Sequence, residues 1–320
     1  MIKVVVKIIA AMLTTLLLVV IGVGVVFWQP DLDRSYIEGK YANTDSRYFI
    51  TSDGNRLHYR DQGNKGRPAL VLIHGTSSSL HTWQPLVESL ETKFRLISFD
   101  LPGHGLTGEF KSRDYSDTVM VSTMIELLDA LNVEKATLVG NSLGGRVALK
   151  AALAKPDLVN ALILLAPGGA KRQSKAPSNI GFKILKSSIG QKLMQKIAPR
   201  FLVKRSLEQT IFDKSLVSDA LTDRYWELLL NQGNRRAIVD LAKSNKHTHI
   251  MDKLTNINVA SLIIWGKSDN ILPVDMIRQF ESQLNVSQSV LYDEIGHLPQ
   301  FEAVDTLTEQ VISFCSDHKC

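Results

Sequence analysis

Six short apolar runs, separated by longer segments with helical periodicity, constrain the fold of this 320-residue chain more than any other feature. The runs lack the apolar–polar alternation of half-exposed strands, as expected where helices cover both faces of a sheet. Strands that alternate with helices form a mostly parallel sheet, so the sequence predicts an α/β fold. The runs are Ala69–His74, Arg95–Asp100, Ala136–Gly140, Ala161–Ala166, Leu262–Trp265 and Ser289–Tyr292.

A hairpin precedes these runs and a long helical interval interrupts them. Tyr48–Thr51 and Arg56–Arg60 flank the turn sequence S-D-G-N, which indicates a hairpin. About 95 residues separate the fourth and fifth runs, far more than a crossover needs, and helical spacing predicts a cap there. Such a cap would lie over the carboxyl ends of the strands, where ligands bind. The predicted divisions are a linker at 29–46, a core at 47–168 and 256–316, and a cap at 169–255.

The N-terminal segment predicts a membrane anchor over residues 1–28. Ile8–Trp28 holds 21 residues without a charge, and a helix needs about 20 apolar residues to cross a bilayer. A cleaved signal peptide has an apolar region of about 7–15 residues and a small-residue cleavage site, and both are missing here. Lys3 and Lys7 precede the run, which favours a cytoplasmic N-terminus and a catalytic body outside the cytoplasm, in the periplasm if the source is bacterial.

Ser142 is the predicted nucleophile. Gly140 to Gly144 reads G-N-S-L-G, and this G-x-S-x-G pattern lies after an apolar run and before a helical segment. A serine flanked by glycines is more often a simple turn residue, but the strand before and the helix after favour a strained nucleophile turn. The two glycines would remove steric clashes, and the helix N-terminus would favour developing negative charge.

A nucleophilic serine requires a histidine base and an acid that orients it. Asp269 follows the fifth run and His297 follows the sixth, so both lie at the same sheet edge as Ser142. Asp275 is a rival acid, but its position after Pro273 predicts the start of the next helix. The sequence therefore predicts a catalytic triad of Ser142, Asp269 and His297.

The loop after the first run predicts an oxyanion hole. The backbone N–H of Thr76 would pair there with the N–H of Leu143, the residue after the nucleophile. We expect His74 to stabilise this loop and His104 to have no chemical role. No metal ion or organic cofactor is implied by these residues.

The chain resembles the α/β-hydrolase fold superfamily, with a helical cap, over about residues 48–314. Within the superfamily it is similar to membrane-anchored bacterial lipases and esterases. Dehalogenases and epoxide hydrolases have an aspartate as nucleophile, so the serine argues against both. The meta-cleavage C–C hydrolases share the G-N-S and W-G-x-x-D features. The matching motifs are H-G-T (74–76), D-L-P-G-H-G (100–105), G-N-S-L-G-G (140–145), W-G-K-S-D (265–269) and G-H-L-P-Q-F-E (296–302).

These features together predict a serine hydrolase that cleaves acyl esters through an acyl-enzyme, either a lipid-related esterase or a lipase. Two alternatives stay open. A C–C hydrolase of the meta-cleavage type would use the same triad on a vinylogous diketone. A membrane-tethered binding protein without catalysis would retain the fold alone.

The predicted cap carries a basic stretch that suggests a membrane as a partner. Residues 171–205 contain ten lysines and arginines and no acid, interleaved with apolar residues. A charge run is most often a solvated face, but a basic amphipathic stretch is typical of membrane-surface binding. Nucleic acid is disfavoured because no binding motif accompanies the stretch. Cys315 and Cys320 are the only cysteines, and their pairing is left open.

Overall fold

The computed structural model describes residues 2–171, 180–244, 250–284, 288–318 and 320. These residues form an eight-stranded sheet in the order β1-β2-β4-β3-β5-β6-β7-β8. The β1–β2 and β2–β4 pairs are antiparallel and the remaining neighbours are parallel, as the apolar runs predicted. The strands are β1 (Arg47–Ile50), β2 (Arg56–Gly63), β3 (Ala69–Ile73), β4 (Arg95–Phe99), β5 (Ala136–Asn141), β6 (Val159–Leu165), β7 (Ala260–Gly266) and β8 (Gln288–Tyr292).

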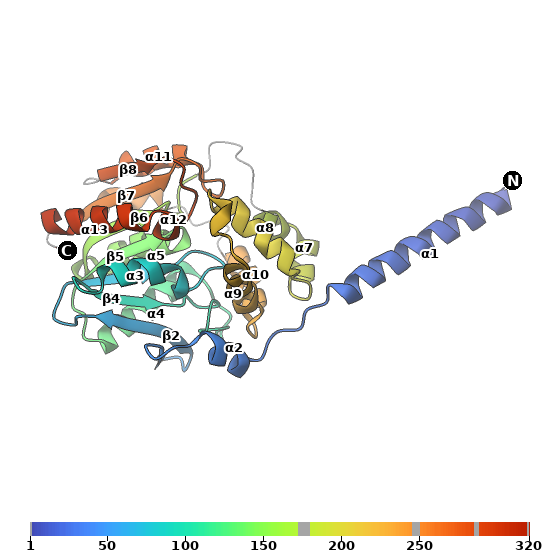
Figure 1. The fold of residues 1–320 in the computed structure, drawn as a ribbon, viewed down its shortest axis with the longest axis horizontal. Helices are drawn as coiled ribbons and strands as arrows, with labels where there is room; N and C mark the ends of the chain where they lie inside the picture. The colour runs from blue at the N-terminus through green and yellow to red at the C-terminus, as the bar shows by residue number, and fades with distance from the viewer. Residues whose placement is uncertain (1, 172–179, 245–249, 285–287, 319) are drawn as a thin grey trace.

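Helices cover both faces of the sheet (Figure 1). Side chains alternate along β3, so Leu70 and Leu72 join one buried cluster while Val71 and Ile73 join another. The first cluster packs under α3 and α13, and the second packs under α4 and α5. Because every β3 residue is buried on one face or the other, the run has no polar alternation. The helices of the core are α3 (Gln84–Leu90), α4 (Asp117–Ala130), α5 (Leu143–Ala154), α11 (Ile277–Glu281), α12 (Pro299–Glu302) and α13 (Val304–His318).

In the described part of the interval between β6 and β7, which the sequence assigns to a cap, the structure has five α-helices. The cap helices labelled in Figure 1 lie at the end of the core from which the N-terminal helix projects. Arg172 and Lys175 of the predicted basic stretch lie outside the described residues. The five helices are α6 (Ile180–Lys186), α7 (Ser188–Met194), α8 (Arg200–Thr210), α9 (Asp219–Leu230) and α10 (Asn234–Ser244).

Helix α1 (Ile2–Val26) extends away from the rest of the molecule (Figure 1). Its described apolar side chains are largely exposed, among them Ile8, Met12 and Leu18. The side chains of residues 16, 17, 19–21, 23 and 25 lie outside the described part. Over the part of the chain that is described, no helix has the length and apolar character needed to cross a bilayer. The structure thus gives the predicted membrane span no support.

The predicted linker at 29–46 is more ordered than the sequence suggested. It contains α2 (Arg34–Tyr41), whose N-cap residue Asp33 accepts a hydrogen bond from the N–H of Ser35 at 2.8 Å. Ile37 is buried in a small cluster with Leu106 and Leu228. A two-turn helix with one buried residue shows no apolar periodicity, which explains why it was not expected.

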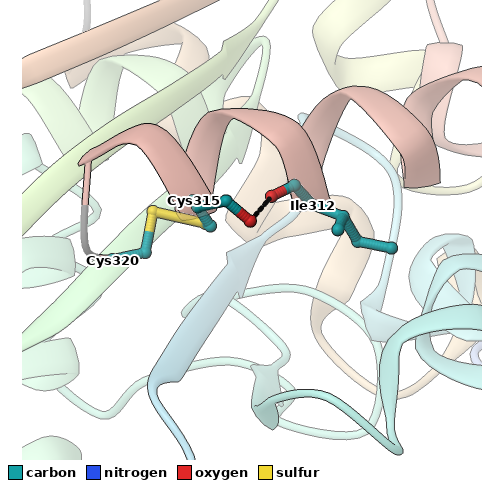
Figure 2. Close-up of a disulfide and its surroundings, with 4 residues drawn as sticks. Ile312, Cys315 and Cys320 are labelled. Carbon is teal, nitrogen blue, oxygen red and sulfur yellow. Dashed lines mark hydrogen bonds between the residues drawn. A yellow bond between two sulfur atoms is a disulfide. The ribbon is translucent and has the colours of Figure 1, made fainter.

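The two cysteines are joined. Figure 2 shows the disulfide between Cys315, near the end of α13, and Cys320, the final residue. Their Cα atoms are 4.7 Å apart, and the two cysteines are separated by five positions in the sequence. The sequence left open whether these two cysteines pair, and in the structure they do.

Candidate active site

Ser142 lies on the sharp turn between β5 and α5, with φ of 55° and ψ of −113°. A Cβ at Gly140 would lie 2.4 Å from the carbonyl oxygen of Gly144, and a Cβ at Gly144 would lie 2.0 Å from that of Ile73. No side chain fits at either position, so the two glycines are what permit this strained turn. The turn leaves the serine side chain partly exposed in a cavity.

Asp269 and His297 are in direct contact at the same edge of the sheet. Nδ1 of His297 lies 2.6 Å from Oδ2 of Asp269, and both side chains are buried. The other carboxylate oxygen accepts the N–H groups of Ile271 at 2.7 Å and Leu272 at 2.9 Å. These bonds fix the carboxylate toward the imidazole, so Nδ1 carries the proton and Nε2 is free to act as a base.

Asn141 connects the serine turn to the histidine loop. Its Nδ2 donates to the carbonyl oxygen of His297 at 3.0 Å and to that of Leu165 at 3.1 Å. His297 and Ser142 also line one cavity, although they are 155 residues apart in sequence. Of the three residues predicted as a triad, Asp269 thus contacts His297, and His297 lines the same cavity as Ser142.

Glu302 holds the histidine loop, and sequence reasoning did not assign it a role. Its carboxylate accepts the N–H groups of Gly296 at 2.9 Å and Leu298 at 3.0 Å, on either side of His297. It also accepts the N–H of Phe212, which follows cap helix α8, at 2.7 Å. Burial raises the pKa of Glu302 above its ordinary value, against the effect of these donors.

The cap also contacts the histidine loop directly. The N–H of His297 donates to the carbonyl of Thr210, the last residue of α8, at 2.8 Å. A Cβ at Gly296 would lie 2.4 Å from that same carbonyl oxygen. The backbone around His297 is therefore held by hydrogen bonds to the cap on one side and to Glu302 on the other.

The predicted oxyanion residues lie beside Ser142. Thr76 lines the cavity with the serine, and a Cβ on the neighbouring Gly75 would come within 3.2 Å of the Ser142 Cβ. Leu143 begins α5, so its N–H belongs to the first turn, whose donors have no acceptor within the helix. Both residues are thus placed where donors to an oxyanion would be needed.

His74 and His104 have structural surroundings. His74 donates from Nδ1 to the carbonyl of Gly75 at 2.7 Å and accepts the N–H of Leu101 at Nε2 at 2.9 Å. It therefore ties the Thr76 loop to the D-L-P-G-H-G turn. Burial lowers the pKa of His74, and burial lowers the pKa of His104 to about 3, so both rings are neutral near pH 7.

A largely apolar cavity of about 170 Å³ extends from Ser142 under the cap. Its wall is formed by cap residues such as Leu185, Met194 and Leu202. Among the described residues that line it, none is an arginine, a lysine or a carboxylate. Among the described residues there is also no group of three or more histidine, cysteine or acidic side chains that could hold a metal ion. The cavity fits an apolar chain whose reacting group is placed at the serine.

The sheet order, the strained serine turn and the histidine–carboxylate contact define an α/β enzyme fold of the hydrolase type. A family model described as alpha/beta hydrolase fold matches residues 68–304. The chain belongs to this family, and both its fold and its family membership identify it as a hydrolase.

Two relatives and one solved structure illustrate the similarity. A hydrolase of Bacillus subtilis (strain 168), YugF, is 28% identical over 267 residues, covering 83% of this chain and 96% of the relative. The 2-hydroxy-6-oxononadienedioate/2-hydroxy-6-oxononatrienedioate hydrolase of Burkholderia vietnamiensis is 26% identical, covering 86% of this chain and 94% of the relative. The crystal structure of a candidate lipase of Acinetobacter baumannii AYE has a TM-score of 0.75 and 25% identity, covering 91% of this chain and 98% of that one.

Proposed function

We propose that the protein is a serine hydrolase of carboxylic esters with an apolar acyl chain, either an esterase or a lipase. The observation that supports this most is the 2.6 Å contact of Asp269 with His297, which lines the same cavity as Ser142. A serine hydroxyl becomes a nucleophile when a histidine accepts its proton, and the histidine is oriented for this by a carboxylate. The similarity to a lipase structure supports the same class of substrate.

The proposed reaction proceeds in two halves. Ser142 Oγ attacks the acyl carbonyl carbon while His297 Nε2 takes the hydroxyl proton, and the N–H groups of Thr76 and Leu143 stabilise the oxyanion. The imidazolium, stabilised by Asp269, gives that proton to the leaving alkoxide, and the alcohol departs from the acyl-enzyme. Water then gives a proton to His297 and attacks the acyl carbon, which releases the carboxylic acid and restores the serine.

The cavity disfavours the alternative C–C hydrolysis that the Burkholderia relative's name describes. The dienedioate substrates in that name carry two carboxylates, and a buried carboxylate requires a cationic or hydrogen-bonding partner. The described lining of the cavity provides no arginine or lysine. An uncharged acyl ester suits such a wall better.

A substrate screen separates the two reactions. We expect the full chain to hydrolyse p-nitrophenyl esters, with kcat/KM rising with acyl length until the chain exceeds the cavity. A 2-hydroxy-6-oxo-dienedioate should react far more slowly, because its two carboxylates would lose their hydration without gaining a cationic partner. The ester proposal would be refuted if the protein hydrolysed the dienedioate and did not hydrolyse the p-nitrophenyl esters.

Glu302 provides a prediction about positioning. In the Glu302→Gln variant an amide NH₂ replaces one acceptor oxygen, so the loop that carries His297 loses hydrogen bonds from the backbone. We expect kcat on a p-nitrophenyl ester to fall by up to about a hundredfold with KM little changed, because the base is displaced from the serine. The matched Glu309→Gln change, at an exposed position of α13, should leave kcat at the native value. Equal kcat values in the two variants would remove Glu302 from the catalytic account.

We also propose that the N-terminal segment 8–28 attaches the protein to a membrane with the catalytic body outside the cytoplasm. The exposed apolar side chains of α1 and the lysines that precede its apolar run favour this arrangement. The Cys315–Cys320 disulfide agrees with it, because disulfides persist in oxidising compartments (Figure 2). Alkylation of both thiols without prior reduction, in protein taken from intact cells, would count against this location.

A further inference from the structure

Residues 27–33, which we call the strap, join α1 to α2 and lie against the cap. The N–H of Gln29 donates to the carbonyl of Lys196, just after α7, at 2.9 Å. The N–H of Leu32 donates to the carbonyl of Leu230, at the end of α9, at 2.7 Å. One short segment therefore contacts two separate parts of the cap.

An ion pair fixes the strap in place. Arg235 on α10, whose side chain is 2% exposed, donates from Nε to Asp31 at 3.0 Å and from a terminal nitrogen to the carbonyl of Gln29 at 2.8 Å. A guanidinium this buried requires such partners, so the strap is part of the folded structure. Because the strap follows α1 directly, the N-terminal helix is joined to the cap rather than to the far side of the core.

Four large apolar side chains are exposed on α7, α8 and the strap, and we call them the apolar rim. Trp28 is 53% exposed, Ile189 70%, Leu193 50% and Phe201 57%. Isolated exposed apolar residues are common on soluble proteins, but gathered ones mark an interaction surface. Ile189 and Leu193 are four residues apart and therefore share one face of α7.

The rim is continuous with the end of α1. The ring of Phe27 lies 5.9 Å from that of Phe201 in an edge-to-face arrangement. Trp28 forms a backbone bridge with Ile197, one turn beyond Leu193. Phe27 and Trp28, directly after α1, therefore lie against α8 and the residues that follow α7.

Two lysines lie at the rim. The ammonium of Lys196 lies 5.5 Å from the ring centre of Trp28, and Lys192 is exposed beside Leu193. The stretch 171–205 contains no acidic residue. Lysine beside exposed aromatic and aliphatic groups complements anionic headgroups above acyl chains.

We propose that the apolar rim docks on an anionic lipid bilayer and that the cavity takes its acyl substrate from there. The second part rests on the ester-hydrolase function proposed above. It follows from the arrangement of α7 and α8, because Met194, Ile197 and Leu202 of the same region line the cavity. Docking would leave only this thin wall of the cap between the catalytic serine's cavity and the lipid.

The test uses the full chain, native or carrying Ile189→Gln, Leu193→Gln and Phe201→Gln together, with vesicles of phosphatidylcholine alone or with added phosphatidylglycerol. Hydrogen exchange of the native α7 and first turn of α8 should slow on the vesicles that contain phosphatidylglycerol, and the triple variant should lose this protection. Hydrolysis of vesicle lipid by the variant should fall about tenfold or more relative to its hydrolysis of p-nitrophenyl butyrate. None of the three residues lines the cavity, so the soluble ester should react at the native rate.

The matched control is the double variant Ile50→Gln and Leu291→Gln, which removes exposed apolar residues from β1 and β8. It should retain both the protection and the native ratio of the two activities. The docking proposal would be overturned if vesicles left hydrogen exchange of α7 and α8 in the native chain unchanged. It would also be overturned if the control variant lost as much protection as the triple variant. A chain that hydrolyses no ester yet shows the protection would refute the proposed function and leave the docking surface supported.

Discussion

The Ser142→Ala variant is expected to lose ester hydrolysis by about 10⁵- to 10⁶-fold in kcat while retaining its fold. Removing the hydroxyl removes the only protein atom proposed to bond to the acyl carbon, so no acyl-enzyme can form. The strained backbone at φ of 55° is as accessible to alanine as to serine, so stability should change little. Initial rates with a p-nitrophenyl ester and thermal unfolding by circular dichroism measure both parts.

Ser89→Ala, at an exposed position on α3, is the matched control and should retain the native rate. If Ser142→Ala retained more than a small fraction of native activity at an unchanged melting temperature, the nucleophile would have to lie elsewhere.

Asp269→Asn is expected to reduce kcat by about 10³- to 10⁴-fold. The carboxylate accepts a hydrogen bond from the N–H of His297 Nδ1 at 2.6 Å, and this bond selects the tautomer with the proton on Nδ1 and none on Nε2. An asparagine whose oxygen stays bonded to the N–H groups of Ile271 and Leu272 would present NH₂ to the ring. The imidazole would then be held in the wrong tautomer, so Nε2 could not take the serine proton.

Asp275→Asn tests the rival acid in the same assay. Asp275 lies in a short 3₁₀ turn, Val274–Met276, after Pro273, as the sequence predicted. We expect this variant to keep the native kcat, since the hydrogen bond to His297 comes from Asp269. A larger loss in Asp275→Asn than in Asp269→Asn would reverse the assignment.

The features that the sequence predicted well have local or pairwise causes. Strands β3 to β7 are apolar runs because helices cover both of their faces, so the runs located them to within one or two residues. The run at 289–292 also located β8, but the expectation that it is buried was wrong, since most of its residues are exposed at the edge of the sheet. Parallel strands bring their carboxyl ends to one edge, which is why the sequence predicts Asp269 and His297 at the same edge as Ser142. The glycines at 140 and 144 follow from the steric demands of one turn.

The features that were missed depend on contacts between distant parts of the chain. Glu302 joins the histidine loop to Phe212, which is 90 residues away and belongs to the cap. The strap is ordered by Arg235, about 200 residues from Asp31. Asp33 before a short helix is a capping signal that could have indicated α2, but neither ion pairs nor carboxylate contacts across such separations leave a periodic pattern.

Labelling with a fluorophosphonate, followed by mass spectrometry of the modified peptide, tests most directly whether a distant imidazole and carboxylate activate one serine. The probe should bond to the native chain at the side chain of residue 142, and replacement of His297 by alanine should slow the labelling by several orders of magnitude. An adduct on another residue, or labelling at the native rate without the imidazole, would contradict the account.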